Sequence, residues 1–370
     1  PSEPGADLAG HTSPSKHTVK HQAGVRESIN ISEQQDFIEA NRGLIAKEED
    51  VLVKNEQGKT IWDTSEYNFI NGEAPASVNP SLWRQAKLNN IHGLFKVSEG
   101  IYQIRGYDLS NITIIEGKTG WIIVDTLTAT ETAKAAMDFA RKHLNNEDHH
   151  KPIKAVIYTH SHIDHFGGIN GILSAEEAKQ NNVRIIAPLG FTEAATSENI
   201  QVGLAMGRRA MMMYGKHLSR SERGHVGSGL GKSPAYGRFG FIQPTEIIDH
   251  TGQTLEIDGL QFIFQYAPES EAPAELTFYL PERKAFCGAE LVSRTMHNLY
   301  TLRGAKVRDA LKWSSYINEA RRLFADSEVY FASHHWPMWG QENISSFLAK
   351  QADGYQFTHD QSVRLINEGF

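Results

Sequence analysis

Four side chains that commonly bind metal ions lie within six residues of this chain. They belong to the segment Thr159-His160-Ser161-His162-Ile163-Asp164-His165. In an extended backbone, residues i and i+2 point in the same direction, so His160 and His162 can face one ion while Asp164 and His165 turn toward a second. Neutral imidazole and carboxylate groups suit zinc, and also iron or manganese. The spacing therefore predicts a two-metal site with hydrolytic chemistry.

The neighbouring sequence predicts where this motif lies. Residues 153–158 form a short apolar run typical of a buried strand, and Phe166-Gly167-Gly168 supplies flexible backbone before the next element. We therefore place the motif in a loop between a strand and a helix. The alternative, that these histidines only stabilise a loop, is disfavoured because the spacing, the strand and the glycine pair agree.

In this setting the motif resembles the metallo-β-lactamase superfamily. The resemblance implies an α+β fold, an αββα sandwich in which two mixed β-sheets are flanked by helices and a dinuclear site lies along one edge. It also implies a bridging acid and a final histidine from loops after later strands. Glu290, at the end of the strand-like run 284–290, matches the bridging acid. His334 and His335 follow another strand-like run, and we take His335 as the ligand.

One ligand of the second metal departs from most of that superfamily. The loop after Leu260–Ala267 contains no histidine and reads Pro268-Glu269-Ser270-Glu271-Ala272-Pro273-Ala274-Glu275. Together with Glu290 and the segment 297–305, this run resembles the alkylsulfatase branch of the superfamily. In that branch a glutamate of the E-A-P-A-E run binds metal. By position it is Glu271, with a neighbouring glutamate as the alternative.

The resemblance implies two Zn²⁺ ions per chain, whose charge the ligands nearly cancel. Asp164, Glu271 and Glu290 supply three negative charges against four positive ones. A bridging hydroxide would bring the cluster to neutrality, so an anionic sulfate ester needs a further cation. Arg303 offers a planar fork suited to tetrahedral oxyanions, although a surface ion pair is its alternative role.

Other side chains could act on the substrate. Asn298 can add a hydrogen-bond donor beside Arg303, and Tyr236 is a candidate sulfate donor by resemblance, or an ordinary packed tyrosine. His297 could protonate the leaving group. Its alternative role is to hydrogen-bond a metal ligand and hold it in place. The metals would lower the pKa of a water and neutralise charge on the reacting oxygens. Asp164, Arg303 and His297 form the predicted catalytic set.

These features predict hydrolysis of alkyl sulfate esters, which are detergent-like amphiphiles, to an alcohol and inorganic sulfate. Alternatives are another dinuclear hydrolase of this fold, acting on a lactone, lactam or thioester, and a mononuclear iron oxygenase. The missing histidine after Ala267 and the presence of Arg303 speak against the first. The full ligand set speaks against a one-iron site. A metal-binding or assembly subunit is the non-enzymatic alternative.

The predicted organisation has three parts. Residues 1–94 form an N-terminal extension whose first 22 or so residues are too polar to bury a core. Residues 95–345 form the catalytic domain, and residues 346–370 begin a helical region. Alkylsulfatases usually continue with dimerisation helices and a sterol-carrier-like domain, so we expect the chain to be a piece of a longer, homodimeric protein.

Composition excludes several classes of protein. With 370 residues, of which 40% are hydrophobic, the chain can bury a large core. A net charge of −7 argues against nucleic-acid binding, and therefore against the nuclease branch of the superfamily. No run of 18 apolar residues exists, so no membrane span is expected, and the single Cys287 excludes an internal disulfide.

The first residue is not Met and bacterial alkylsulfatases are often exported, so a periplasmic or secreted location is expected.

Two segments in the middle of the chain need separate interpretation. Residues 231–233 read Gly-Lys-Ser, but Val226 stands where a phosphate loop requires glycine, so residues 219–240 are expected to form a mobile active-site loop instead. Met206–Leu218 contains three successive methionines, which could line an alkyl-binding wall. We expect them in the core.

Secondary-structure signals complete the prediction. Strands are expected at 101–105, 111–116, 121–125 and 183–187, and an antiparallel meander at 254–288. A helix is expected at 131–144, begun by a capping box of Thr128 and Glu131. A second helix is expected at 305–324, with core residues Leu311, Ile317, Ala320 and Leu323.

Overall fold

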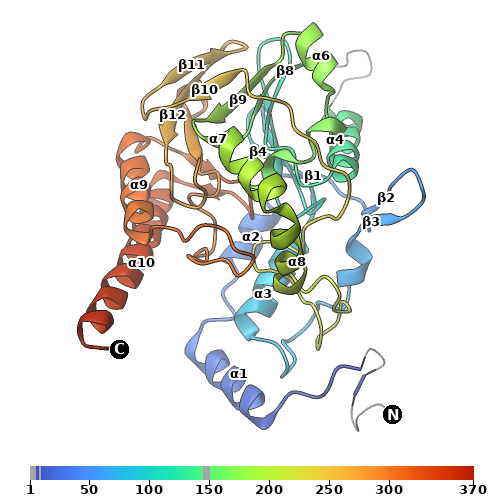
Figure 1. Ribbon diagram of the computed structural model, residues 1–370, viewed down its shortest axis with the longest axis vertical. Helices are drawn as coiled ribbons and strands as arrows, with labels where there is room; N and C mark the ends of the chain where they lie inside the picture. Colours follow the sequence, from blue (N-terminus) through green and yellow to red (C-terminus); the bar gives the residue numbers. More distant parts are fainter. Residues whose placement is uncertain (1–5, 8–9, 145–150) are drawn as a thin grey trace.

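The computed structural model describes residues 6–7, 10–144 and 151–370, and in that part of the chain two large sheets lie between layers of helices (Figure 1). The first sheet has the order β1-β4-β5-β6-β7-β8-β9-β10, antiparallel from β1 to β7 and parallel from β7 to β10. Its strands are β1 Leu44–Ala46, β4 Gly93–Ser98, β5 Ile101–Arg105, β6 Ile112–Glu116, β7 Trp121–Val124, β8 Ile153–Ile157, β9 Arg184–Pro188 and β10 Glu246–Ile248.

The second sheet has the order β11-β12-β13-β14-β15-β16 and is antiparallel except where β14 and β15 run parallel. Its strands are β11 Thr254–Ile257, β12 Leu260–Tyr266, β13 Leu276–Leu280, β14 Ala285–Cys287, β15 Val329–Phe331 and β16 Met338–Trp339. A separate hairpin joins β2 Leu52–Lys54 to β3 Thr60–Asp63.

Three apolar clusters hold the layers together. Between the sheets, Ile122, Val124 and Ile157 of the first meet Phe264 and Phe278 of the second, all fully or nearly fully buried. Strands buried on both faces read as continuous apolar runs, which explains the sequence Trp-Ile-Ile-Val of β7. The outer face of the first sheet packs on helix α4, Thr130–Leu144, and that of the second packs on α9, Ala310–Leu323, and α10, Gln341–Asn367. The predicted αββα sandwich is confirmed.

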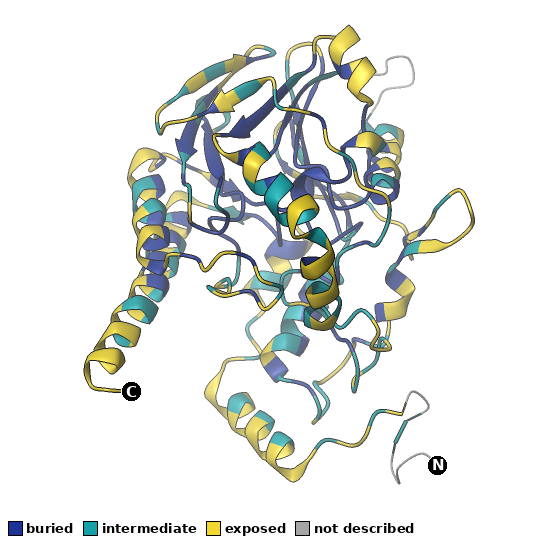
Figure 2. Ribbon diagram, in the orientation of Figure 1, coloured by how far each residue is buried: buried dark blue, intermediate teal, exposed yellow. Residues whose placement is uncertain are grey.

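The remaining helices lie around one end of the sandwich or near its edges (Figure 1). They are α1 Lys16–Ser28, α2 Gln35–Asn41, α3 Pro80–Asn89, α5 Ile163–Phe166, α6 Ala175–Gln180, α7 Phe191–Thr196 and α8 Gly203–Met213. Helix α1 falls partly in the segment expected to be flexible, where Ser15 caps it by accepting from the Thr18 amide, yet it buries no residue. The buried sheets contrast with the exposed α1, α8 and the end of α10 (Figure 2). None of the helices in the described part of the chain has the length and apolarity to cross a membrane.

The N-terminal segment joins the sandwich directly. Strand β1 pairs with β4 at the edge of the first sheet. Asp36 of α2 accepts from both Arg84 and Arg294 at 2.8 Å, which ties α2 to α3 and to the segment after β14. The domain limits at residues 94 and 345 stay predictions.

Two local expectations are wrong. Leu311 and Leu323 are 45% and 51% exposed, because α9 buries the face that carries Trp313, Ile317 and Ala320. Thr128 and Glu131 form no capping box. Each side chain instead fixes a distant segment: Thr128 donates to Asp108 at 2.8 Å, and Glu131 accepts from Arg238.

Candidate active site

The candidate metal ligands come from loops at one edge of the two sheets. The His160–His165 segment follows β8, and its second half forms the short helix α5. Glu271 lies between β12 and β13, Glu290 follows β14 and His334 follows β15. Backbone pairing joins these loops, since His160 bridges to Glu275 and Ser333 donates to the Ala289 carbonyl at 2.9 Å. Hydrogen bonding between strands therefore brings together ligands that are far apart in the sequence.

The glycine pair after the motif serves close packing. A Cβ on Gly168 would lie 2.1 Å from the Thr126 carbonyl oxygen, and one on Gly167 would lie 2.4 Å from that of Thr128. Gly167 and Gly168 have ordinary negative φ angles, −62° and −82° respectively. Absence of side chains, rather than backbone flexibility, allows α5 to sit against the segment after β7.

Seven side chains form two groups that could each hold a metal ion. The first contains His160, His162, Glu271 and Glu290, and the second contains Asp164, His165, Glu290 and His334. Glu290 belongs to both, and its Oε2 lies 3.1 Å from Nε2 of His160 and of His165 and 3.2 Å from Nε2 of His334. The structure thus groups His160 with His162 and Asp164 with His165, and places Glu290 where the sequence prediction put the bridging acid.

The donor atoms fit a pair of cations. His160, Glu271, His165 and His334 are all at most 2% exposed, and the Nε2 atoms of the last two lie 3.2 Å apart. Nε2 of His160, Oδ2 of Asp164 and Oε2 of Glu271 have no hydrogen-bond partner among the described residues. Buried polar atoms normally have partners, so a cluster of lone pairs aimed at common points indicates metal binding.

Hydrogen bonds behind the histidines fix which nitrogen is free. His165 Nδ1 donates to Asp125 at 2.8 Å, and His334 Nδ1 donates to the Leu109 carbonyl at 3.2 Å. His160 Nδ1 lies 3.0 Å from the Thr159 hydroxyl, which in turn donates to Asp125 at 2.8 Å. Each arrangement leaves Nε2 as the free acceptor, as in carboxylate–histidine–metal relays. Asp125 lies at φ +59°, a strained turn at the end of β7 that this network holds in place.

His335 is not in either group, contrary to the prediction. Its φ of +63° turns its side chain away from the cluster, while His334 remains inside. His335 Nε2 donates to the Gly229 carbonyl at 3.1 Å, and its Nδ1 accepts from the Arg294 amide at 3.2 Å. Burial, and then the neighbouring His334, lowers the pKa of His335 to about 3, so the ring stays neutral. Adjacent histidines offer no sequence signal for this backbone turn.

Arg308, which sequence reasoning missed, organises the first group. Its guanidinium donates to both the backbone carbonyl and Oε1 of Glu271, leaving Oε2 for an ion. Its Nη1 donates to the side-chain oxygen of Asn298 at 2.9 Å and to that residue's carbonyl at 3.0 Å. Burial raises the pKa of Glu271, but Arg308 and then His162 outweigh it and hold that pKa below its usual range. Arg308 therefore joins the ligand loop to the loop that carries Asn298.

The other glutamate of the run has a different place. Glu275 is fully buried and accepts from the Ser270 hydroxyl at 2.9 Å and from the amides of Glu271 and Glu290 at 3.1 and 3.2 Å. Burial, and then the Glu271 carboxylate, raises its pKa well above the usual value. Glu275 thus positions the backbone of two ligands, and Glu271 is the member of the run that reaches the cluster.

A cavity of about 1290 Å³ opens over the metal groups. His162, Asp164, Glu271 and Glu290 lie at its base, while helix α8 and residues 227–239 form much of its wall. The sequence suggested that the methionines of α8 lie in the core, but this is wrong for the three successive ones, Met211 to Met213, none of which is fully buried. Met206, Met211 and Met213 line the cavity, and Met212 is 80% exposed.

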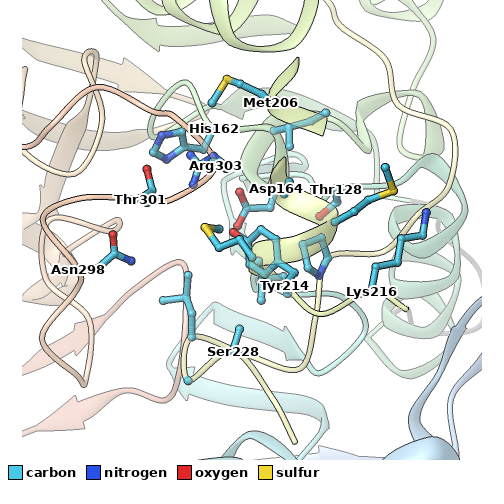
Figure 3. A pocket seen from close by; sticks show the side chains of 18 of the residues that line it. Thr128, His162, Asp164, Met206, Tyr214, Lys216, Ser228, Asn298, Thr301 and Arg303 are labelled. Carbon is cyan, nitrogen blue, oxygen red and sulfur yellow. The ribbon is translucent and has the colours of Figure 1, made fainter. Parts of the chain in front are cut away.

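One side of the cavity gathers polar donors. In Figure 3, Arg303, His162 and Asp164 lie together, with Thr301 and Asn298 beside them. The Thr301 hydroxyl is buried and has no hydrogen-bond partner among the described residues, and Arg303 lies 3.6 Å from Glu198. The structure therefore brings Arg303 and Asn298 close to the metal groups and adds Thr301, two residues before Arg303.

The two tyrosines of the cavity occupy different places. Tyr214 lies beside Asp164 (Figure 3), and burial raises its pKa to about 12 although Arg303 is near. Tyr236 has an unpartnered hydroxyl among the described residues, but Lys216 lies 3.9 Å from its ring centroid, and in Figure 3 Lys216 is on the side away from Asn298 and Thr301. Tyr236 lines the cavity, and its proposed role in sulfate binding stays a prediction.

His297 faces the shared ligand. Its Nε2 lies 3.0 Å from Oε1 of Glu290, and its Nδ1 lies 2.9 Å from the Asn298 carbonyl. The Tyr355 hydroxyl accepts from its backbone amide at 2.9 Å, which anchors the loop to α10. The ring is thus held between the cavity and the metal groups, where it can contact a bound substrate.

Comparison with known proteins agrees with this geometry. The family model of the metallo-beta-lactamase superfamily matches residues 105–334. This range includes all seven grouped side chains, four of them in the motif at residues 160–165 and three farther along the sequence, Glu271, Glu290 and His334. The chain belongs to the metallo-β-lactamase superfamily. The superfamily resemblance predicted from the motif is confirmed.

Within the metallo-β-lactamase superfamily, the curated proteins similar to this chain include several alkylsulfatases. The chain is 49% identical to a linear primary-alkylsulfatase of a Pseudomonas species over 347 residues, which cover 93% of the chain and 51% of that protein. It is 46% identical to the alkyl/aryl-sulfatase BDS1 of Saccharomyces cerevisiae, covering 95% and 54%. The chain therefore spans about half the length of the curated relatives that it matches, and its resemblance to alkylsulfatases is confirmed.

A solved structure has the same fold. The stereoselective inverting sec-alkylsulfatase Pisa1 from a Pseudomonas species superposes with a TM-score of 0.92 at 40% sequence identity. The match covers 98% of this chain and 57% of that one. The similarity extends beyond the sandwich to nearly all of the chain, including the N-terminal segment and the cavity wall.

Proposed function

We propose that this chain carries the catalytic site for hydrolysis of alkyl sulfate esters to an alcohol and inorganic sulfate. The observation that supports it is the placement of two metal-ligand groups, joined by Glu290, at the base of a large cavity that has a cationic side and an apolar side. The names of the similar proteins point to the same substrate class.

The two groups would hold two Zn²⁺ ions, one with His160, His162 and Glu271, the other with Asp164, His165 and His334, and both with Glu290. Imidazole and carboxylate donors suit zinc. When bound, such ions activate water and neutralise charge on the reacting oxygens. Burial raises the pKa of Asp164 and of Glu290, but His165 and His334 respectively outweigh it and hold these pKa values well below the usual range, so both carboxylates are ionised.

The sulfate group would bind between Arg303 and the donors beside it. Arg303 supplies a fixed positive charge with several N–H donors in one plane, which suits the tetrahedral oxygens of a sulfate ester. The Thr301 hydroxyl and the Tyr214 hydroxyl, which stays protonated because its pKa is raised to about 12, can add donors. Arg308 holds the oxygen of the Asn298 amide, so that the NH₂ group can face the cavity.

His297 would hold the proton that the leaving alkoxide receives. Its Nδ1 lies 2.9 Å from the Asn298 carbonyl, and its Nε2 faces Glu290 at 3.0 Å at the base of the cavity, where a general acid can reach a bound ester. A general acid in this place lets the alcohol leave neutral.

The alkyl chain would lie against α8. Met206, Met211 and Met213 present flexible apolar side chains to the cavity, joined by Leu230, Phe239 and Met296. Methionine adapts to irregular apolar ligands because its side chain is unbranched and polarizable. This wall accommodates a flexible hydrocarbon tail and sets no sharp limit on its shape.

The test is release of inorganic sulfate from dodecyl sulfate by the zinc-loaded protein, with metal content measured on each variant. We expect turnover by the wild type, and retained metals with lost turnover in Arg303→Ala. Arg283→Ala is the control, since Arg283 is half-buried and bonds backbone carbonyls of Glu99 and Glu116 outside the cavity. Binding of two zinc ions without sulfate release would reject the substrate and direct the test to lactones and thioesters.

A periplasmic or secreted location and a homodimeric full-length form stay predictions.

A further inference from the structure

A second, much smaller cavity of about 30 Å³ lies beside the substrate cavity. Both cavities share Leu109 and Leu230 as lining residues. The smaller one has room for an ion or molecule of about the size of one or two waters. Its polar lining consists mainly of Arg105 and Lys232, with Asn89, Asp108, His335 and Trp336 around them.

Two buried cations face this space, and neither forms an ion pair with a carboxylate in the described part of the chain. Arg105 and Lys232 are 5% and 4% exposed. Arg105 donates to the Ala40 carbonyl at 2.9 Å and stacks on Phe95 at 3.5 Å, while its Nε has no hydrogen-bond partner among the described residues. Lys232 donates to the Asn89 carbonyl at 2.8 Å, and its Nζ lies 5.8 Å from the Tyr67 ring centroid. Among the described residues the bond to Asn89 is its one hydrogen bond, although an ammonium has three protons to donate.

Asp108, the carboxylate that also lines the cavity, is engaged elsewhere. Its oxygens accept from the Thr128 and Thr132 hydroxyls at 2.8 and 2.6 Å and from the amides of Leu109 and Ala235 at 2.7 and 3.0 Å. One carboxylate beside two cations leaves at least one positive charge uncompensated. Burial accordingly lowers the pKa of Lys232 to about 7 and that of Arg105 to about 9, with no opposing charge. Isolated buried charges are costly, so this arrangement favours a counter-ion.

We propose that this cavity binds a monatomic anion of the halide class, chloride in particular, between Arg105 and Lys232. The indole N–H of Trp336, which is buried and unpartnered among the described residues, supplies a further donor. Inorganic sulfate, with five heavy atoms, is larger than a space for one or two waters. The anion site is independent of the substrate proposed above.

Occupancy would stiffen a wall of the substrate cavity. Lys232 belongs to the same loop as Gly229, whose carbonyl accepts from Asn89 at 3.0 Å and from His335 at 3.1 Å. Ser228 of this loop lies at the substrate cavity (Figure 3). An anion that binds Lys232 in the small cavity would therefore also restrict the motion of the adjoining Gly-rich segment 227–231, of which residues 227–230 line the substrate cavity.

The first test is thermal unfolding of the zinc-loaded protein in sodium gluconate and in sodium chloride at equal ionic strength. We expect chloride to raise the Tm saturably by about 2 °C. Lys232→Met is expected to lose this response and, in gluconate, to be at least as stable as the wild type because an unpaired buried charge is gone. Lys96→Met is the matched control, because Lys96 is exposed and pairs with Glu99 at 2.5 Å, so its chloride response should persist.

The second test needs no variant. In crystals of the wild type soaked in bromide, we expect an anomalous peak within contact distance of the Lys232 ammonium. A cavity that contains only water, with no saturable chloride effect on Tm, would overturn the proposal. A chloride response that persists in Lys232→Met would also overturn it, since the anion would then bind at the metal centre.

Discussion

The metal centre and the substrate cavity share His162, Asp164, Glu271 and Glu290, yet they are built in different ways. The ligands of the metal centre are nearly fully buried, and a second hydrogen bond fixes most of them, as Asp125 fixes His165 and Arg308 fixes Glu271. Much of the cavity wall consists of α8 and of irregular backbone, and its lining residue Leu204 is 82% exposed. The metal-ligand side chains thus lie on loops that hydrogen bonds hold at the edges of the sheets. The cavity proposed to bind the substrate is lined instead by adaptable side chains such as the methionines of α8.

This comparison predicts that changes at the metal centre abolish activity and that changes in the wall adjust it. The largest effect is expected for Glu290→Gln, because both groups share this carboxylate. Both metals should be lost and activity should fall below about 0.1% of the wild type, since no ion remains to activate water. Metal analysis and sulfate release measure this. Retention of two tightly bound metals would contradict the bridging role of Glu290.

Arg308→Gln tests whether the hydrogen bonds that Arg308 donates to Glu271 contribute to metal affinity. We expect metal affinity to fall by about 10–100-fold, which is typical of outer-shell partners of metal ligands. Calorimetric titration with Zn²⁺ gives the affinity directly. Arg283→Gln is the control outside the site, and equal affinities in the two variants would show that Arg308 has no positioning role.

The metal centre should depend on pH through His334. Burial lowers the pKa of this imidazole, but Glu290 and Asp164 outweigh burial and raise the pKa to about 9 in the metal-free protein. Below that pH a cation must displace a proton, so affinity should rise by about tenfold per pH unit from pH 7 to 9 and then level off. Competition with a chelator over this range measures it, and a flat profile would show that no proton is displaced.

The smallest effect is expected in the cavity wall. Met211→Ala removes apolar contact from α8 and should raise KM for dodecyl sulfate by about fivefold, roughly 1 kcal/mol, with little change in kcat. KM for a short alkyl sulfate should stay unchanged. Met212→Ala is the matched control, because Met212 is 80% exposed and does not line the cavity. Equal effects on long and short substrates would place the alkyl chain elsewhere.

The sequence by itself determined the chemistry of the metal centre. Residues 160–165 carry both the ligand types and the spacing, and the strands before the motif and before Glu290 are recognisable from their apolar runs. These signals are local, because a short spacing on an extended backbone already fixes which side chains point together. The resemblance to alkylsulfatases added Glu271, and the charge balance of the metal cluster added Arg303; spacing alone would select neither.

Only the tertiary structure decided between His334 and His335, because a backbone turn at φ +63° aims one ring at the metal groups and the other at Gly229. It also placed Arg308 behind Glu271, across 37 residues of sequence, and turned the methionines of α8 toward the cavity. An apolar helical face has the same sequence pattern whether it meets a core or a hydrocarbon ligand, since both offer an apolar environment. The packing of the neighbouring elements determines which of these it contacts.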